Sequence, residues 1–197
     1  MSGIILASTS ASRRAMLTAA GVEYESVAPL VDEDGVKAAC AGWRVRDVAD
    51  RLAEMKAVKV SRAWPGRYVL GSDSMVALDR TSWLDKPGSL DGLRAQLRAL
   101  RGREHRLVSA AVVAKDGEPV WRQTEEARLT VREFSERWLE DYVAACGAAV
   151  VSSVGGYHLE ALGVQLFERI EGDGFVIRGL PLLHLLAWLR MVGVMPA

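Results

Sequence analysis

Asp73 is the carboxylate of this chain whose surroundings most demand a charged partner. It lies between Leu70 and Val76, in a strand-like and strongly apolar stretch. Removing an ionised carboxylate from water costs free energy unless a cation compensates for it. The compensating group is either a metal ion or a basic side chain, and a turn-capping role for Asp73 is a further alternative that the sequence leaves open.

A second acidic cluster, Asp32-Glu33-Asp34, lies earlier in the chain. Such runs are usually solvated turns, because aspartate readily occupies turns. Their carboxylates are also the oxygen ligands that Mg²⁺ prefers. The cluster therefore predicts either an exposed turn or a second part of a metal site.

Four basic residues are candidates for binding phosphate. Arg13 and Arg14 stand at the start of a predicted helix. Cationic side chains there oppose the helix dipole unless an anion is bound as well, which favours phosphate. For Lys56 and for Lys86, each taken alone, a surface charge is the preferred interpretation. Magnesium on one or two carboxylates, with lysine and arginine neutralising the remaining charge, is the usual way in which proteins bind nucleoside triphosphates.

Other site classes lack their characteristic spacing. The three histidines are too far apart in the sequence to suggest zinc, namely His105, His158 and His184. The two cysteines, Cys40 and Cys146, show neither a metal motif nor a disulfide pattern, which fits a reducing cytosol. The glycine-rich segments match no P-loop and no dinucleotide fingerprint.

The elements that must position these groups alternate between strand and helix. Hydrophobic periodicity predicts strands over 4–7, 24–28, 68–78, 107–114, 120–131 and 164–170. It predicts helices over 10–20, 45–60, 90–100 and 134–146, and a final buried helix over 180–189. The strand over 68–78 is expected to be interrupted at its polar centre, Ser72-Asp73-Ser74. This pattern predicts that the chain forms one compact α/β unit with an active-site cleft.

Composition excludes several partner classes. Lysine plus arginine and aspartate plus glutamate both number 25, so the net charge is zero and no global charge attracts nucleic acid or a membrane surface. The apolar stretch over 180–189 is shorter than the roughly 20 residues that span a bilayer. The apolar N-terminus lacks the positive segment of a signal peptide. We expect a cytoplasmic protein with neither a nucleic-acid nor a membrane partner.

Taken in order, these groups resemble the Maf family of nucleotide pyrophosphatases along nearly the entire chain. The motifs that carry the resemblance are Leu6-Ala7-Ser8-Thr9-Ser10 with Arg13-Arg14, Val31-Asp32-Glu33, Leu52-Ala53 with Lys56-Ala57, Gly71-Ser72-Asp73 with Asp85-Lys86-Pro87, the segments 100–105 and 156–160, and Gly179-Leu180-Pro181. The resemblance implies a mixed twisted sheet with flanking helices and two lobes around a nucleotide-binding cleft, in one domain over 1–197. It also implies a homodimer that uses Mg²⁺ or Mn²⁺ to hydrolyse a nucleoside triphosphate to the monophosphate and pyrophosphate.

The resemblance assigns roles to individual residues. Asp73, Glu33 and Lys86 would be catalytic, and the metal would be held by Asp73, Asp32 and Glu33. The substrate-binding residues would be Ser8, Arg13, Arg14, Lys56 and Glu160.

Substrate selection is where the chain departs from the family pattern. Glu160 matches the branch that acts on methylated guanosine triphosphates, whereas Ser12 and Ser74 replace the tryptophan and the glutamine of that branch, and Ala161 replaces a glycine. The sequence therefore leaves several nucleotide bases open for the substrate. Two other functions stay open as well: a nucleotide-binding regulator of septum formation and cell division with little turnover, and a house-cleaning phosphatase of modified nucleotides that releases orthophosphate.

Overall fold

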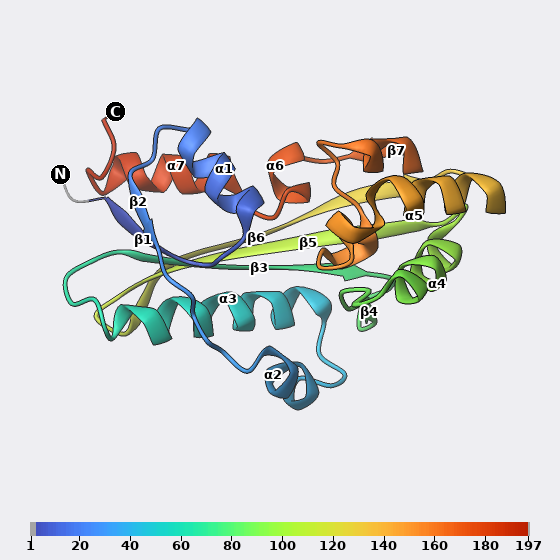
Figure 1. Cartoon of the computed structure of the whole chain (residues 1–197). Helices are drawn as coiled ribbons and strands as arrows, with labels where there is room; N and C mark the ends of the chain where they lie inside the picture. Colours follow the sequence, from blue (N-terminus) through green and yellow to red (C-terminus); the bar gives the residue numbers. More distant parts are fainter. Residues whose placement is uncertain (1–2, 197) are drawn as a thin grey trace.

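The computed structural model describes residues 3–196, and its centre is one mixed sheet (Figure 1). The strands are β1 (Ile4–Ala7), β2 (Tyr24–Ser26), β3 (Val69–Ala77), β4 (Trp83–Leu84), β5 (Glu104–Lys115), β6 (Glu118–Val131) and β7 (Phe167–Glu171). The α-helices are α1 (Ala11–Ala19), α2 (Glu33–Ala39), α3 (Val45–Ser61), α4 (Leu90–Leu100), α5 (Glu136–Val150), α6 (Gly174–Ile177) and α7 (Leu182–Met191). Two 3-10 helices, η1 (Val154–Gly156) and η2 (Leu162–Leu166), lie between α5 and β7.

The sheet has the order β2-β1-β3-β5-β6-β7, and β4 pairs with β3 outside this path. β1 is parallel to β2 and β3, whereas the pairs β3–β5, β5–β6 and β6–β7 are antiparallel. The long hairpin β5–β6 turns at Asp116 and Gly117, which both have positive φ angles (52° and 84°) as a tight two-residue hairpin requires. The predicted pair of strands joined at this turn is confirmed.

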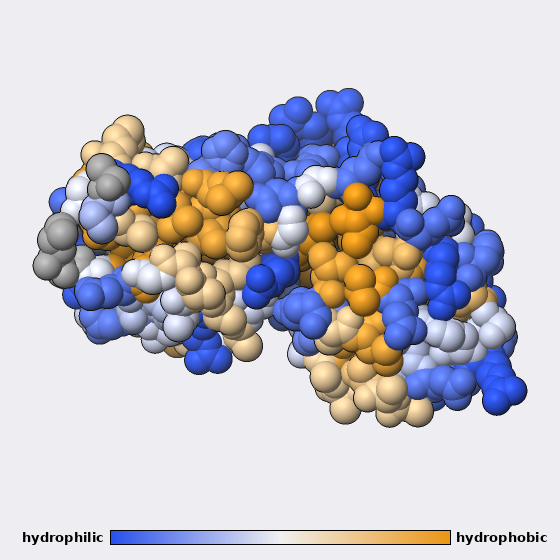
Figure 2. Space-filling view, turned by 90° about the horizontal axis from the view of Figure 1, so that it is seen from above, coloured by the Kyte–Doolittle hydropathy of each residue, from blue (hydrophilic) through white to orange (hydrophobic). Residues whose placement is uncertain are grey.

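Helices cover both faces of the central strands. α3 packs along one face, against alternate residues of β3 and β5 such as Met75 and Val108. On the other face, α1 and α7 cover one end, and α4, α5, η1 and η2 pack together at the other end (Figure 1). Figure 2 shows the molecule narrowing between these two groups. The predicted α/β fold, with a mixed twisted sheet, flanking helices and two lobes, is confirmed.

The predicted interruption of the central strand is wrong. β3 runs unbroken from Val69 to Ala77, and Ser72, Asp73 and Ser74 all keep their register with β5. Successive side chains of a strand point to opposite faces. The two serines therefore face α1 and the loop before α7, Asp73 faces α3, and each finds a polar partner without breaking the ladder.

The acidic cluster is the start of a helix rather than a solvated turn. Asp32 is the N-cap of α2 and accepts a hydrogen bond from the Gly35 N–H at 3.0 Å, while Glu33 and Asp34 occupy the first turn. Both positions suit carboxylates, because the helix N-terminus carries unpaired N–H groups and a positive partial charge. The prediction of a plain turn overlooked this capping pattern.

The C-terminal apolar stretch forms α7, which is buried along one face only. Leu182, Leu185 and Leu189 are buried, whereas Leu183 is 58% exposed. Within residues 3–196, no helix is both long and apolar enough to cross a membrane.

Candidate active site

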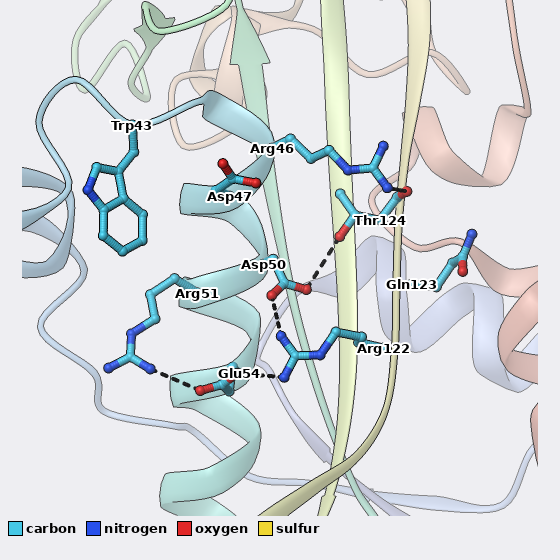
Figure 3. Close-up of a pocket in the computed structure, with 9 residues that line it drawn as sticks. All are labelled: Trp43, Arg46, Asp47, Asp50, Arg51, Glu54, Arg122, Gln123 and Thr124. Atoms are coloured by element: carbon cyan, nitrogen blue, oxygen red, sulfur yellow. Dashed lines mark hydrogen bonds and ion pairs between the residues drawn. The ribbon is translucent and has the colours of Figure 1, made fainter.

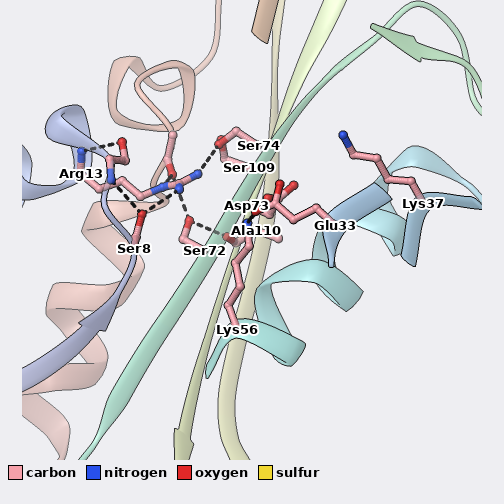
Figure 4. A network of polar contacts seen from close by, with 12 residues as sticks. Ser8, Arg13, Glu33, Lys37, Lys56, Ser72, Asp73, Ser74, Ser109 and Ala110 are labelled. Atoms are coloured by element: carbon pink, nitrogen blue, oxygen red, sulfur yellow. Dashed lines mark hydrogen bonds and ion pairs between the residues drawn. The ribbon is translucent and has the colours of Figure 1, made fainter. Parts of the chain in front are cut away.

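Two carboxylates converge on one buried lysine. The Lys56 Nζ lies 2.6 Å from the Asp73 Oδ1 and 2.7 Å from the Glu33 Oε1 (Figure 4). Lys56 and Asp73 are 5% and 7% exposed, so both charges are largely removed from water. Such burial is costly unless the groups are paired, and here each charge compensates the other. The trio keeps one net negative charge.

The close approach of α3 to β3 creates this pairing. Gly71 faces α3, and a Cβ at this position would lie 2.2 Å from the Ala53 carbonyl oxygen. The glycine therefore allows the helix backbone to lie directly on the strand. Lys56 is one turn after Ala53 and on the same side of the helix, which brings its ammonium group over Asp73, two residues beyond Gly71.

Glu33 is ionised at neutral pH. Partial burial opposes its charge, but Lys56, Lys86 and Lys37 together hold the pKa of this carboxyl below its usual value. Lys86, an exposed residue in the segment before α4, thus contributes its charge to the same site. The cluster is consequently a set of fixed opposite charges.

Arg13 lies on the other face of β3. Its Nε donates to the Gly179 carbonyl at 2.9 Å, its Nη1 to the Ser8 Oγ at 3.3 Å and its Nη2 to the Ser74 Oγ at 3.0 Å (Figure 4). Burial lowers the pKa of Arg13, while the charges of Asp73 and Glu33 act in the opposite direction. Guanidinium groups stay protonated in proteins, so Arg13 is a fixed cation.

Serines of β3 and β5 form a hydrogen-bond network that holds Arg13 and its partners in place. The Ser74 Oγ lies 2.9 Å from the Ser109 Oγ, and Ser109 donates to the Val176 carbonyl at 2.7 Å. Ser72 shares the same face and donates to the Gly179 carbonyl at 3.0 Å. Ser74 therefore belongs to the support of Arg13, a placement that its departure from the family pattern did not suggest.

An unpaired stretch of β3 separates the two charged groups. The ladder with β1 ends at Gly71, and the ladder with β4 begins at Val76. Between them, within the part of the chain that the structure describes, one edge of β3 has no neighbouring strand. A ligand lying across this edge would meet Arg13 on one side and the Asp73 cluster on the other.

The other predicted site residues lie outside these contacts. Asp32 uses its carboxylate to cap α2, and the Arg14 side chain is exposed at the surface of α1. Glu160 is exposed between η1 and η2. Sequence reasoning missed Lys37, which forms an ion pair with Asp85 beside the cluster. The sequence feature that could have indicated Lys37 is its position four residues after Glu33, which places both side chains on the same face of a helix.

The donors in the cluster fit a hard divalent cation. Mg²⁺ typically takes one or two carboxylates and completes its shell with water and substrate phosphates. Asp73 and Glu33 supply two carboxylates that already meet at one cation, and each has lone pairs beyond its bond to Lys56. Residues 3–196 contain no ready group of three or more histidine, cysteine or acidic ligands.

A separate open hollow of about 450 Å³ lies between α3 and β6 (Figure 3). Its charged groups satisfy one another: Arg122 pairs with Asp50 and Glu54, and Arg51 pairs with Glu54. None of the predicted site residues lines it. The hollow is a surface feature apart from the charged cluster.

Comparison with known proteins decides the family. The model of the Maf-like protein family matches residues 3–192. The chain belongs to the Maf-like family. A Caulobacter vibrioides protein named nucleoside triphosphate pyrophosphatase is 52% identical over 98% of this chain and 96% of its own length. Proteins of the same name from Sphingopyxis alaskensis and Hyphomonas neptunium are each 48% identical over 98% of both chains.

The family match and these relatives confirm two predictions: the family is Maf-like, and the enzyme class is hydrolase. A solved structure of a nucleoside-triphosphatase, dITP/XTP pyrophosphatase, from Mycobacterium abscessus aligns with 98% of this Maf-like chain and 97% of its own chain. The sequence identity is 16% and the TM-score is 0.42. That likeness is too distant to bear on the site.

Proposed function

We propose that this Maf-like protein hydrolyses a nucleoside triphosphate to the monophosphate and pyrophosphate, and that it needs Mg²⁺ or Mn²⁺ to do so. The observation that carries the proposal is the convergence of Asp73 and Glu33 on Lys56, opposite Arg13 across the free edge of β3. The names of the relatives support the same reaction. We further propose a cytoplasmic homodimer that takes neither nucleic acid nor a membrane as partner.

Asp73 and Glu33 are the residues that would hold the divalent ion. Bound there, the ion would neutralise phosphate charge and lower the pKa of a coordinated water. Asp32, the third predicted ligand, accepts a hydrogen bond from the Gly35 N–H as the N-cap of α2, and it thereby fixes the start of the helix that carries Glu33.

Three cations surround the space for the phosphates. Within residues 3–196, Arg13 is held by Ser8, Ser74 and Gly179 through three of its five N–H donors, so two donors remain for phosphate oxygens. Lys56 and Lys86 approach from the side of the carboxylates. Cations fixed before the reaction stabilise the charge that develops as the α-phosphorus is attacked, without reorganising at that moment.

Base recognition is assigned to Glu160. An ionised carboxylate only accepts hydrogen bonds, which suits the adjacent N–H donors of guanine better than the mixed edge of uracil or thymine. Its exposure in the free protein means that water competes for it, so discrimination depends on how far the nucleotide covers this residue. We propose a guanosine-type triphosphate, natural or modified, as the substrate.

A substrate panel tests the proposal. We expect pyrophosphate release, without orthophosphate, from guanosine-type triphosphates in the presence of Mg²⁺ or Mn²⁺. Chelation of the ion with EDTA should abolish turnover and leave the melting temperature of the free protein unchanged. Orthophosphate as the product would favour the phosphatase alternative. Nucleotide binding without turnover would instead support the regulatory alternative, which the named relatives do not favour.

A further inference from the structure

One ion pair crosses from α2 to the segment that carries Lys86. The Lys37 ammonium group donates to the Asp85 carboxylate, and Asp85 directly precedes Lys86. Neither member of the pair contacts the carboxylate–lysine trio through a hydrogen bond of its own. The pair nevertheless joins two segments that each bring one charged residue to the site, Glu33 and Lys86.

α2 depends on polar contacts for its position. None of its seven residues is fully buried, and its one apolar contact with the core is the partly buried Val36, so it has a much smaller apolar anchor than most helices. Glu33 and Lys37 are four residues apart and therefore lie on one face of the helix. That face reaches the rest of the molecule through two ion pairs, Glu33 with Lys56 and Lys37 with Asp85.

The far end of the ion pair is itself anchored. The Asp85 carbonyl accepts a hydrogen bond from the Gln96 Nε2 at 2.7 Å, and Gln96 belongs to α4. A movement of α2 is thus opposed by α4 through Asp85. Charge reinforces the arrangement: burial opposes the cation, yet the bond to Asp85 and the charges of Asp73 and Glu33 raise the pKa of Lys37.

We propose that the ion pair between Lys37 and Asp85 positions the site: it holds Glu33 and Lys86 at the distance from each other that binding of the triphosphate requires. We call this ion pair the latch. The inference rests on the proposed function of the site. Lys37 acts through Glu33 and the segment of Lys86, and it does not contact the reacting atoms itself. The Lys37 and Asp85 side chains are 20% and 62% exposed, so the pair contributes little to global stability. Its loss should appear in turnover rather than in melting.

The experiment is a double-mutant cycle on pyrophosphate release. Lys37→Ala and Asp85→Ala should each lower kcat/KM by roughly five- to fiftyfold, less than the about hundredfold that a 1 Å misplacement can cost. The double variant should be no worse than either single variant, because both remove the same link. The conservative variant Lys37→Arg, which keeps a cation that can pair with Asp85, should retain most of the activity. Arg51→Ala, which breaks a surface pair on α3, is the matched control and should behave as the parent protein.

Several outcomes would overturn the latch. A loss in Lys37→Ala combined with parental activity in Asp85→Ala would mean that Lys37 binds the triphosphate directly. The latch is also rejected if the losses of kcat/KM in the two single variants multiply in the double variant, or if all variants keep the parental kcat/KM. It is rejected as well if the melting temperature falls in step with kcat/KM, because the pair would then stabilise the fold. If the parent protein releases no pyrophosphate, the proposed function fails instead. The same variants are then compared by calorimetry with α,β-methylene GTP and Mg²⁺, where the latch requires the same non-additive pattern in affinity.

Discussion

At the scale of single residues, the site holds an excess negative charge on one face of β3 and, within the described residues, a cation without an anionic partner in its hydrogen bonds on the other. Lys56 has two anionic partners and Asp73 has one cationic partner at 2.6 Å. Arg13 is held by neutral acceptors alone, two serine hydroxyls and a carbonyl. The side of α3 is therefore suited to a cation and the side of α1 to an anion, as a metal-bound triphosphate requires.

Asp73→Asn should abolish turnover and leave the fold intact. The amide keeps the shape of the side chain but loses the charge that the ion needs, and losing several kcal/mol of metal-derived stabilisation lowers kcat by on the order of a thousandfold. Lys56 stays paired with Glu33, so little stability should be lost. Turnover and melting are measured together, with Asp50→Asn as the control at a surface pair of α3. Near-normal turnover in a folded Asp73→Asn protein would remove Asp73 from the mechanism.

Residue types alone predicted part of this arrangement. The apolar surroundings of Asp73 indicated a compensating cation, and the structure supplies Lys56, one of the four basic candidates. Lys37 and the supporting role of Ser74 could not be predicted in this way. Both depend on contacts between segments far apart in the chain, 48 residues for Lys37 with Asp85 and 61 for Arg13 with Ser74.

At the scale of elements, the site depends on how closely α3 lies against β3. The helix presents Ala53 and Ala57 to the strand, and Gly71 offers no side chain in return. Periodicity predicted both elements, because each has a long and regular apolar pattern. It placed an interruption where β3 continues, and it missed α2, which has capping and ion pairs but only Val36 packed against the core.

Gly71→Ala should push α3 away from β3. The new methyl group would lie 2.2 Å from the Ala53 carbonyl oxygen and 2.6 Å from the Ala57 nitrogen, and helix backbone cannot yield as a flexible side chain can. Overpacking of this kind costs typically about 1–3 kcal/mol. It also moves Lys56 away from Asp73, so kcat should fall as well. Gly174→Ala is the control, because nothing lies within 4 Å of the added Cβ. Unchanged stability and turnover in Gly71→Ala would contradict the close-packing argument.

At the scale of the whole molecule, the two lobes share their central strands. Val76 and Leu107 pack in the lobe with α4 and α5, whereas Leu70 and Ala111, on the same two strands, pack in the lobe with α1 and α7. Separating the lobes would break β3 and β5 in the middle of their ladder. This continuity is our reason for proposing that residues 1–197 fold as one domain. It predicts that a perturbation in one lobe lowers the stability of both.

His105 offers such a perturbation through pH. It lies in β5 with 1% of its surface exposed, and its Nε2 is 2.8 Å from the Tyr157 hydroxyl oxygen, while its Nδ1 has no hydrogen-bond partner in the described part of the chain. Burial lowers the pKa of His105 to about 4, against an ordinary value of 6.5. Between these two values the unfolded chain binds the proton and the folded chain does not. The free energy of unfolding therefore falls as the pH falls through this window.

We expect the parent protein to lose roughly 2 kcal/mol of stability between pH 7 and pH 5 from this residue alone, since each unit of pKa difference corresponds to about 1.4 kcal/mol. His105→Gln removes the titrating group and should reduce the loss, whatever its own stability at pH 7. The lowered pKa of Glu33 does not interfere, because its contribution is lost only below the ordinary glutamate value of 4.5. Urea unfolding at the two pH values, followed by circular dichroism and by tryptophan fluorescence, measures the difference. Because the lobes share β3 and β5, both signals should report one transition that shifts as a unit. An equal loss in parent and variant would mean that His105 is not buried in its neutral form, and two separate transitions would refute the single domain.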